Sequence, residues 1–232
     1  MSASSSSPWW SWLVTALVPV ALVLAVVRLL LTPLFIQVEY RLPCFPPDPY
    51  GFSTADRLRW ADLARQYLLN DADRSFVADL RMDDHRPLFN EREVRHLEDV
   101  KAVVQAALRV GWAAWAGLLV LGLVARRRGA RAWRAFRAAV ARGGWLTVAL
   151  MGAIIVAVAV AFGPFFVFFH RLFFEGDSWL FATSDSLIRL FPERFWVDAF
   201  LATGLLSALA GWLCTRWAPR ASWSDARAAA GS

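Results

Sequence analysis

Three histidines are the side chains of this sequence best suited to proton transfer near neutral pH: His85, His96 and His170. His85 lies in a polar stretch and is interpreted as a solvated loop residue. His96 is spaced i, i+4 and i+7 with Arg92 and Asp99, so the three share one face of a predicted helix. That spacing alone favours the solvated face of a charged helix over a catalytic arrangement.

His170 ends a run of aromatic residues, 162–169, in which Pro164 is expected to kink a helix. The phenylalanines around it in the sequence are Phe165, Phe166, Phe168, Phe169, Phe173 and Phe174. One interpretation is an anchor at a membrane interface, where aromatic side chains gather. The other is a base beside a confined apolar pocket, which keeps the imidazole neutral and able to accept a proton. The sequence leaves both open.

The elements that must position these histidines are apolar. Hydrophobic residues make up 58% of the 232 residues and the mean hydropathy is +0.42, which exceeds the composition of ordinary soluble domains. The excess gathers in four blocks, each close to the ~20 residues that cross a bilayer core. These blocks are residues 9–31, 103–124, 145–169 and 199–217. The predicted fold class is therefore an all-α membrane protein with four transmembrane helices and a mostly helical extracytoplasmic cap.

The distribution of charge predicts the topology. The loop 125–144 holds seven arginines and no acid, whereas residues 39–101 carry thirteen acids and ten bases. The positive-inside rule places this loop in the cytoplasm and the segments 32–102 and 170–198 outside, where they form the cap. The net charge of +6 is thus a topology signal, and no nucleic-acid partner is expected.

Residues 9–217 are predicted to form one membrane domain. The stretches 1–8 and 218–232 are interpreted as a disordered N-terminus and a cytoplasmic tail, so that both termini are cytoplasmic. The first block has no charged segment before it and is longer than the core of a signal peptide, which favours a retained helix over a cleaved one. Cys44 and Cys214 lie at opposite membrane faces and are not expected to pair.

Local patterns predict further helices. Residues 54–69 have apolar side chains near one helix face, with Thr54 as the expected N-cap. Asn90, with a glutamate three residues later, resembles a capping box, and the helix it opens is expected to continue from Glu91 to Val124. In the arginine-rich loop, the apolar face of Trp133, Phe136 and Val140 predicts an amphipathic helix on anionic lipid.

The predicted topology places His96 and His170 at one membrane level and on one side. Two such groups suit acid–base chemistry on a lipid ester at the interface. The sequence has neither a GxSxG elbow nor an HExxH motif. A zinc site made of both histidines and a carboxylate, Asp99 or Asp177, is an alternative.

Several segments also resemble one family. Residues 89–101, FNEREVRHLEDVK, resemble the FNERE-x-x-HMEDVK segment of a bacterial family of four-helix membrane proteins. Residues 169–174, FHRLFF, resemble its FHxxFF segment, and residues 179–196 resemble its WxxDPxxDxLIxxFP region. This family is that of the lipoprotein intramolecular transacylase, Lit, and the resemblance covers nearly the whole chain. Leu97 stands where methionine is usual, and residues 180–185 lack the proline-containing spacing.

The resemblance implies a membrane acyltransferase of the bacterial cytoplasmic membrane, with catalytic histidines that match His96 and His170. Its reaction passes the sn-2 acyl chain of a diacylglyceryl group to the α-amine of the same lipoprotein's N-terminal cysteine, which gives the lyso form. The implied partners are the diacylated lipoprotein and membrane lipid. No cofactor and no metal are expected, and the oligomeric state is left open.

The residues fit such a reaction without a covalent acyl-enzyme. One histidine is expected to remove the amine proton and the other to protonate the departing glyceryl oxygen, in an order left open. The substrate-binding residues are predicted to be Arg92, Asp99, Phe165, Phe166, Phe169, Phe173 and Phe174. Arg92 has two possible interpretations: it contacts the substrate's headgroup or oxyanion, or it pairs with acidic residues of its own helix. Asp99 either orients His96 or pairs with a neighbouring arginine.

Two rival interpretations belong to other classes: a non-catalytic scaffold whose cap binds a partner, and a zinc-dependent lipid hydrolase. The distance between the histidines discriminates between them. Histidines within ~8 Å of each other and among aromatic rings favour the enzyme, and histidines that point apart into solvent favour the scaffold. Asp185 and Arg189 are expected only to tie the second external segment to the cap.

Overall fold

A computed structural model describes residues 8–218 of the chain. Its helices are α1 (Trp9–Leu30), α2 (Pro33–Glu39), α3 (Thr54–Leu69), α4 (Ser75–Ala78), α5 (Glu91–Arg127), α6 (Ala130–Phe173), α7 (Ser186–Leu190) and α8 (Glu193–Thr215). Among them α1, α5, α6 and α8 are long and apolar enough to cross a membrane. The predicted all-α fold with four membrane-spanning helices and a mostly helical cap is confirmed, while the side of the membrane that the cap faces stays a prediction. The ends expected to be disordered lie almost wholly outside the described residues.

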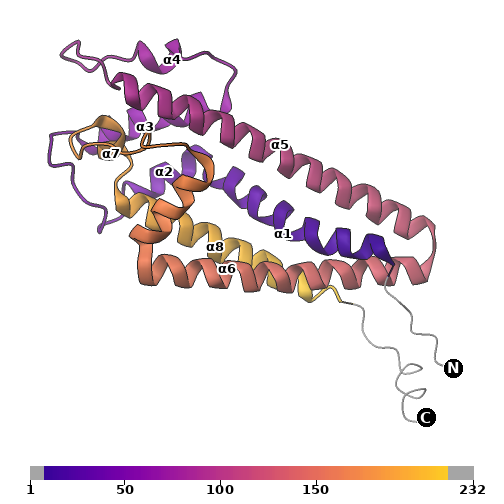
Figure 1. Ribbon diagram of the computed structural model, residues 1–232. Helices are drawn as coiled ribbons and strands as arrows, with labels where there is room; N and C mark the ends of the chain where they lie inside the picture. Colours follow the sequence, from indigo (N-terminus) through magenta and orange to yellow (C-terminus); the bar gives the residue numbers. More distant parts are fainter. Residues whose placement is uncertain (1–7, 219–232) are drawn as a thin grey trace, which may run out of the picture.

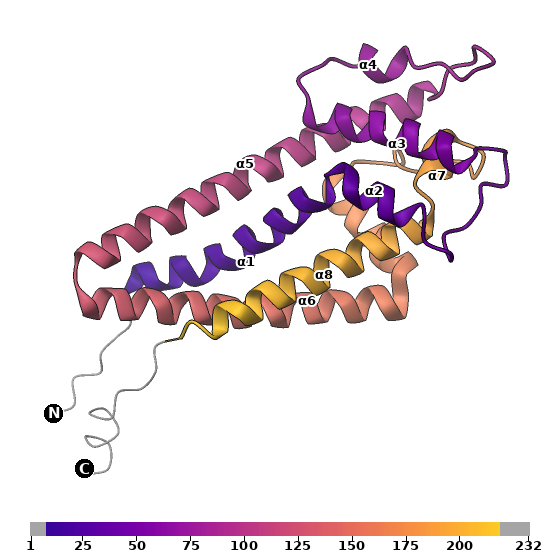
Figure 2. The same cartoon turned by 180° about the vertical axis from the view of Figure 1, so that it is seen from behind.

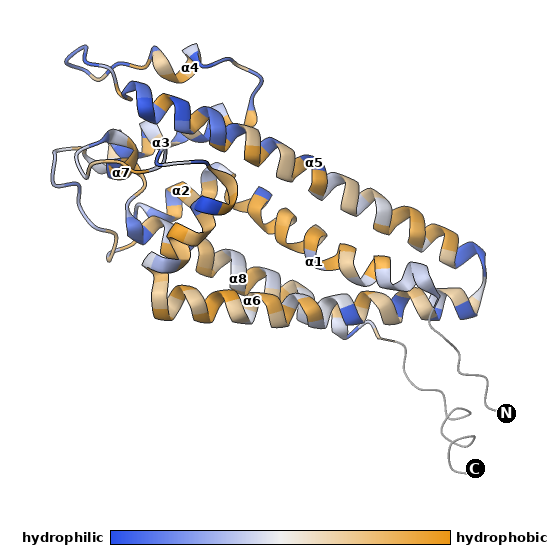
Figure 3. Cartoon of the chain, in the orientation of Figure 1, coloured by the Kyte–Doolittle hydropathy of each residue, from blue (hydrophilic) through white to orange (hydrophobic). Residues whose placement is uncertain are grey.

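The four long helices form a bundle, and the short helices α2, α3, α4 and α7 gather at one end of it (Figure 1). Seen from behind, α8 runs along α6 for most of its length (Figure 2). We call the two ends of the bundle the cap end and the turn end, the latter being where α5 joins α6 near Gly129. Hydrophobic residues dominate the bundle, whereas hydrophilic residues concentrate in the cap (Figure 3).

Glycines allow the helices to approach closely in the half of the bundle nearer the turn end. A Cβ atom on Gly143 of α6 would lie 2.8 Å from the Thr15 carbonyl oxygen of α1. A Cβ atom on Gly144 would overlap the carbonyl oxygen of Gly211 in α8. The Thr15 hydroxyl also donates a hydrogen bond of 3.2 Å to the Ala139 carbonyl. Small residues at such crossings increase van der Waals contact between helices.

The arginine-rich stretch differs from the expectation of an amphipathic helix on lipid. It is helical, but it belongs to α6, which begins at Ala130, one residue after the Gly129 turn. Phe136 and Val140 are buried against Val14 and Val18 of α1. The prediction of an apolar helix face is confirmed. This face packs against α1 within the bundle instead of on lipid, because α6 is one continuous helix beside α1.

Helix α5 confirms the prediction of one continuous rod from the cap through the bundle. The Asn90 side chain accepts hydrogen bonds from the backbone N–H groups of Arg92 and Glu93. In return, the Glu93 carboxylate accepts one from the Asn90 N–H at 2.7 Å. The helix then runs for 37 residues, a few beyond Val124, and spans about 55 Å at 1.5 Å per residue.

Helix α6 bends near its cap end, as expected from the presence of Pro164. The backbone leaves helical geometry at Ala161, with φ −148° and ψ 59°. Proline has no N–H for the carbonyl four residues earlier, here Val160, and its ring displaces that carbonyl. The last turns of α6 therefore swing away from the bundle axis (Figure 1).

The cap has its own apolar core. Trp60 and Tyr67 of α3, Val94 of α5 and Leu190 of α7 are each at most 4% exposed. The helix predicted at 54–69 is confirmed as α3, but its N-cap is Ser53 rather than Thr54. The remaining residues of the cap core are Ala64, Val77, Leu88, Phe89, Leu97 and Leu187. Because α5 supplies part of this core, the cap is fixed to the bundle.

Candidate active site

The two histidines singled out in the sequence meet at the junction between the cap and the bundle. The ring centroids of His96 and His170 lie 6.1 Å apart, with their planes at 19°. His96 is 6% exposed and His170 is 8% exposed. His96 comes from the first turns of α5, and His170 comes from the part of α6 beyond the bend. The continuous α5 and the bent α6 together create the pair.

Aromatic rings enclose the pair. The Phe166 ring centroid lies 4.0 Å from that of His170, and Trp179 lies 4.9 Å from it on another segment. Phe174 and Phe181 meet His96 edge-on at 4.9 and 5.3 Å. These rings displace water from the imidazoles, which strengthens any hydrogen bond that a substrate makes to them.

One hydrogen bond determines the tautomer of His170. Its Nδ1 lies 2.9 Å from the Phe166 carbonyl oxygen. A carbonyl oxygen only accepts hydrogen bonds, so Nδ1 carries the proton. In the neutral ring, Nε2 then holds the lone pair and is able to accept a proton from a substrate.

His96 has a different environment. Its Nδ1 is buried and has no hydrogen-bond partner within the described part of the chain. An unsatisfied N–H in a dry site costs more than an unsatisfied lone pair, which favours the tautomer with the proton on Nε2. The two rings therefore offer a substrate one acceptor nitrogen, on His170, and one donor nitrogen, on His96.

Glu93 fixes the segment that covers the histidines. It lies one helical turn before His96 and is 1% exposed. One carboxylate oxygen completes the Asn90 capping box, and the other accepts a 2.6 Å hydrogen bond from the Leu187 N–H. The sequence predicted the capping box, but no pattern in it indicated that Glu93 also bonds Leu187, which is 94 residues away.

Arg92 and Asp99 are both exposed, and neither contacts the histidine rings through a hydrogen bond in the described structure. Arg92 donates a 3.1 Å hydrogen bond to the Leu180 carbonyl oxygen. Arg92 therefore holds the segment that carries Trp179 and Phe181. The structure does not pair Asp99 with His96, although the two lie only three residues apart on the helix.

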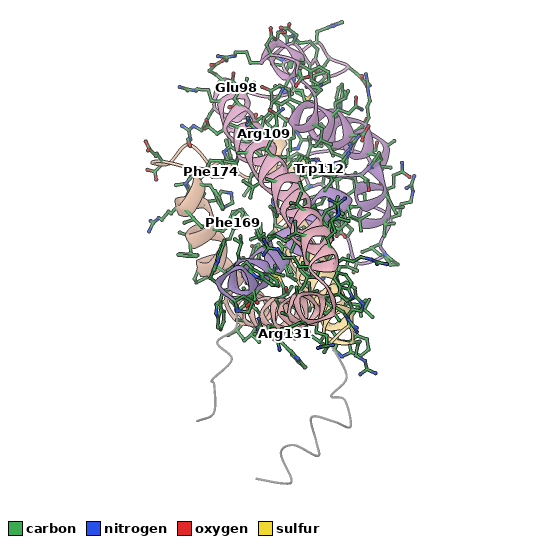
Figure 4. The ribbon with its side chains drawn as sticks, turned by 90° about the vertical axis from the view of Figure 1, so that its right-hand side faces the viewer. Glu98, Arg109, Trp112, Arg131, Phe169 and Phe174 are labelled. Carbon is green, nitrogen blue, oxygen red and sulfur yellow. The ribbon has the colours of Figure 1, made fainter. Side chains whose placement is uncertain are left out.

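The predicted phenylalanines differ in how they approach the histidines. Phe166 and Phe174 contact the histidine rings directly. Phe165 and Phe169 pack against Phe200 of α8, at 5.0 and 5.1 Å between ring centroids, and Phe169 also meets the His170 ring edge-on at 5.9 Å. Figure 4 shows Phe169 and Phe174 one above the other at the cap end of α6, far from Arg131 near its start. Phe173 lies 5.0 Å from Phe169 and is 44% exposed.

Sequence reasoning missed three aromatic residues near the site: Trp179, Phe181 and Phe200. Trp179 belongs to a motif that the sequence showed, but nothing in that motif placed it on a histidine. The expectation that Asp185 and Arg189 tie the second segment to the cap is confirmed. The Asn90 amide donates to Asp185 at 3.2 Å, and Arg189 pairs with Asp48 at 2.9 Å.

The zinc interpretation required a carboxylate beside the two histidines. Within residues 8–218, no three histidine, cysteine, aspartate or glutamate side chains are placed to hold a metal ion. The distance between the histidines and the rings around them instead match the arrangement expected of the enzyme interpretation. Fold and site together define an all-helical membrane protein with a buried histidine pair beneath a cap.

Comparison with known proteins identifies the family. Residues 11–196 match the family model of the lipoprotein intramolecular transacylase Lit, so the chain belongs to that family. A membrane-integral Lit structure from Bacillus cereus superposes with a TM-score of 0.68 at 21% identity, over 89% of this chain and 93% of that one. A variant of it with a histidine replaced by arginine gives 0.64 at 20% identity, over 89% of each chain.

A relative from Aquifex aeolicus, an uncharacterised protein, is 29% identical over 190 residues, which is 79% of this chain and 81% of that protein. Family membership makes the chain a membrane acyltransferase. It moves the sn-2 acyl chain of a lipoprotein's diacylglyceryl group to the α-amine of the same lipoprotein's N-terminal cysteine. The product is a lyso-form lipoprotein.

Proposed function

We propose that His96 and His170 carry out this acyl transfer as a pair, within a cap that faces away from the cytoplasm. The observation that carries the proposal is the buried contact between their rings, 6.1 Å between centroids. Two imidazoles with complementary donor and acceptor nitrogens suit a reaction in which one proton leaves an amine and another group needs a proton.

His170 acts first as the base. The substrate's α-amine has a pKa of ~8, so a fraction of it is neutral at pH 7. As its nitrogen attacks the ester carbonyl carbon, His170 Nε2 removes a proton from that nitrogen. The negative charge that develops on the carbonyl oxygen accepts a hydrogen bond from His96 Nε2–H.

The tetrahedral intermediate then collapses. The new C–N bond remains, the ester C–O bond breaks, and the protonated His170 returns its proton to the departing glyceryl oxygen. Both rings regain their starting states, and no water, covalent acyl-enzyme or cofactor is consumed. Because amine and ester belong to one flexible molecule, positioning them contributes much of the rate enhancement, up to ~7–11 kcal/mol in favourable cases.

The substrate-binding groups that we propose are the rings in contact with the pair, Phe166 and Phe174, together with Phe165, Phe169 and Phe173 toward the lipid. We assign Arg92 a positioning role through Leu180, because its guanidinium is already hydrogen-bonded there. Asp99 is proposed to contact the polar part of the substrate, since it is exposed on the same helix.

The proposed location is the bacterial cytoplasmic membrane, with both termini and the α5–α6 turn in the cytoplasm. Seven arginines near that turn support this orientation. Cys44 is exposed in the cap. A membrane-impermeant maleimide should therefore label Cys44 in intact cells, with the Cys44→Ser variant as the control. Labelling that requires broken cells would reverse the proposed orientation.

The decisive experiment is mass spectrometry of the N-terminal lipopeptide of one abundant lipoprotein, in a host without other N-acylating enzymes. The wild type should yield the lyso form, and His96→Ala and His170→Ala should each lower conversion by about 10²–10⁴-fold. The matched control is His85→Asn, because His85 has φ 67° and asparagine tolerates that conformation. Full activity in both alanine variants, at equal membrane levels, would refute the assignment.

A further inference from the structure

A second site lies in the cap, apart from the histidines. A cavity of about 340 Å³ separates the proline-rich loop 46–50 from Arg57 of α3 and from the residues around α7. Its rim includes Tyr50 and Thr183, which are exposed, so the cavity opens to solvent. Its volume is within the ~300–1,000 Å³ of ligand pockets. The catalytic steps described above use none of these residues.

The walls of the cavity are fixed by buried contacts. Arg189 Nη2 lies 2.9 Å from Asp48 Oδ2, with side chains 11% and 0% exposed. Burial alone would raise the pKa of Asp48, but the bonds from Arg189 and the Phe52 N–H hold that pKa below its usual range. At the rim, the hydroxyl oxygens of Tyr50 and Thr183 lie 3.0 Å apart. The cavity is therefore formed before any ligand enters.

Arg57 gives the cavity an excess of positive charge. The residue is 5% exposed, and its Nη1 donates to the Pro46 carbonyl at 2.7 Å. Its Nε has no hydrogen-bond partner among the described residues. Two guanidiniums, Arg57 and Arg189, line the cavity against one carboxylate, Asp48. Burial lowers the pKa of Arg57, a shift that Tyr40 and Asp48 oppose. A ligand with carbonyl or carboxylate oxygens would complement this surface.

A short segment of the chain connects the cavity to the surroundings of the histidines. Phe181 lies 5.3 Å from the His96 ring, and Thr183, two residues later, is on the cavity rim. The cavity therefore begins within roughly 16 Å of His96, a distance that about five extended residues cover. Asn90 of α5 donates to Asp185 and Arg92 donates to Leu180, so this segment is held against the catalytic helix.

We propose that this cavity binds the polypeptide part of the lipoprotein substrate, as an extended segment a few residues after the lipid-bearing cysteine. The inference rests on the proposed function. The reacting amine and the rest of the polypeptide are both attached to the α-carbon of the lipid-bearing cysteine. When the amine lies at the histidines, the polypeptide must therefore extend through the cap toward the solvent. Backbone carbonyl oxygens occur in every lipoprotein sequence, which allows one site of arginine donors to accept different clients.

Two synthetic diacylglyceryl lipopeptides test the proposal, one with about two residues after the cysteine and one with about ten, which reaches the cavity. The measured quantity is the ratio of kcat/KM for the long substrate to that for the short one. The wild type should favour the long substrate about ten-fold, equivalent to ~1.4 kcal/mol. Thr183→Trp, which fills the rim, should bring the ratio close to one. Ser184→Trp, at the exposed neighbour that does not line the cavity, should retain it.

The outcomes separate the two proposals. If the wild type converts neither substrate, the function fails. If it converts both equally well, or if Thr183→Trp retains the preference, the peptide site is wrong and the function stands. A third result would assign the cavity to a lipid headgroup instead. In that case the rate would depend on anionic lipid in the micelle and not on peptide length, and Thr183→Trp would lose the lipid effect.

Discussion

The turn end and the cap end of the bundle are built from different residues. Toward the turn end, glycines of α6 bring its backbone against α1 and α8, and little space is left for any side chain. At the cap end, α6 bends after Val160 and carries bulky rings toward α5. The close crossing holds α1, α6 and α8 together near the turn end, and the bend determines the position of His170 beside α5.

This contrast separates stability from chemistry. Substitutions at the close crossing should act on the whole bundle and change activity only through unfolding. Substitutions at the bend and next to the histidine pair should also lower the activity of the folded enzyme, because they move one partner of the pair. Four variants test this division, ordered from the largest expected free-energy change to the smallest.

Gly144→Ala should destabilise the bundle most, by about 3 kcal/mol, because the new Cβ would overlap the Gly211 carbonyl oxygen and force the helices apart. Thermal unfolding in detergent, followed by tryptophan fluorescence, measures the loss. Gly152→Ala is the matched control on the same helix, since its Cβ would meet nothing within 4 Å. Equal stability of both variants would show that the crossing is not tightly packed.

Glu93→Gln should cost about 2 kcal/mol in stability. The two Glu93 oxygens accept from the Asn90 and Leu187 N–H groups, whereas a glutamine has one acceptor oxygen and would turn its NH2 group toward one of these buried donors. The loosened segment should also lower lipopeptide conversion, by about ten-fold in kcat. Glu91→Gln is the control, since its ion pair with Arg74 is largely exposed and contributes little. A Glu93→Gln enzyme that loses stability but retains full kcat would contradict the positioning role.

Pro164→Ala restores a backbone N–H and allows α6 to straighten, which withdraws His170 from His96. Conversion should fall about ten-fold, equivalent to ~1.4 kcal/mol in the barrier, while helical content stays the same or rises. Circular dichroism and the lipopeptide assay together measure both effects. Pro19→Ala, at the proline inside α1, is the control. An unchanged rate in Pro164→Ala would mean that packing alone maintains the bend.

Glu39→Gln tests the smallest effect, a pH dependence beneath the cap. Burial, the hydrogen bond to Asp198 and the charge of Asp198 raise the pKa of Glu39 to about 7, despite the nearby Arg194. The folded state thus binds the proton more tightly than the unfolded chain. Stability from this group is full below about pH 4.5 and is lost as pH rises through about 7.

The glutamine variant should therefore match the wild type at pH 5 and melt a few degrees higher at pH 8, a difference of about 1 kcal/mol or less. The comparison needs only melting curves at the two pH values. A melting-temperature difference that is the same at both would mean that the Glu39 carboxyl does not titrate in this range.

Much of the architecture was readable from local patterns. The four apolar blocks predicted the long helices, the capping box predicted the start of α5, and Pro164 predicted the bend. The error over the arginine-rich stretch has a physical cause. An amphipathic face shows that something apolar covers it, but the sequence does not say whether that is lipid or, as here, α1.

The sequence by itself determined which residue types the site contains, since the histidines and phenylalanines and the spacings between them are properties of the sequence. Only the tertiary structure decided which of them meet. Trp179 and Phe181 reach the histidines because Glu93 and Arg92 hold their segment against α5. Asp99 stays apart although it is adjacent on the helix. Contacts between distant segments depend on the path of the intervening chain, and no local pattern records that path.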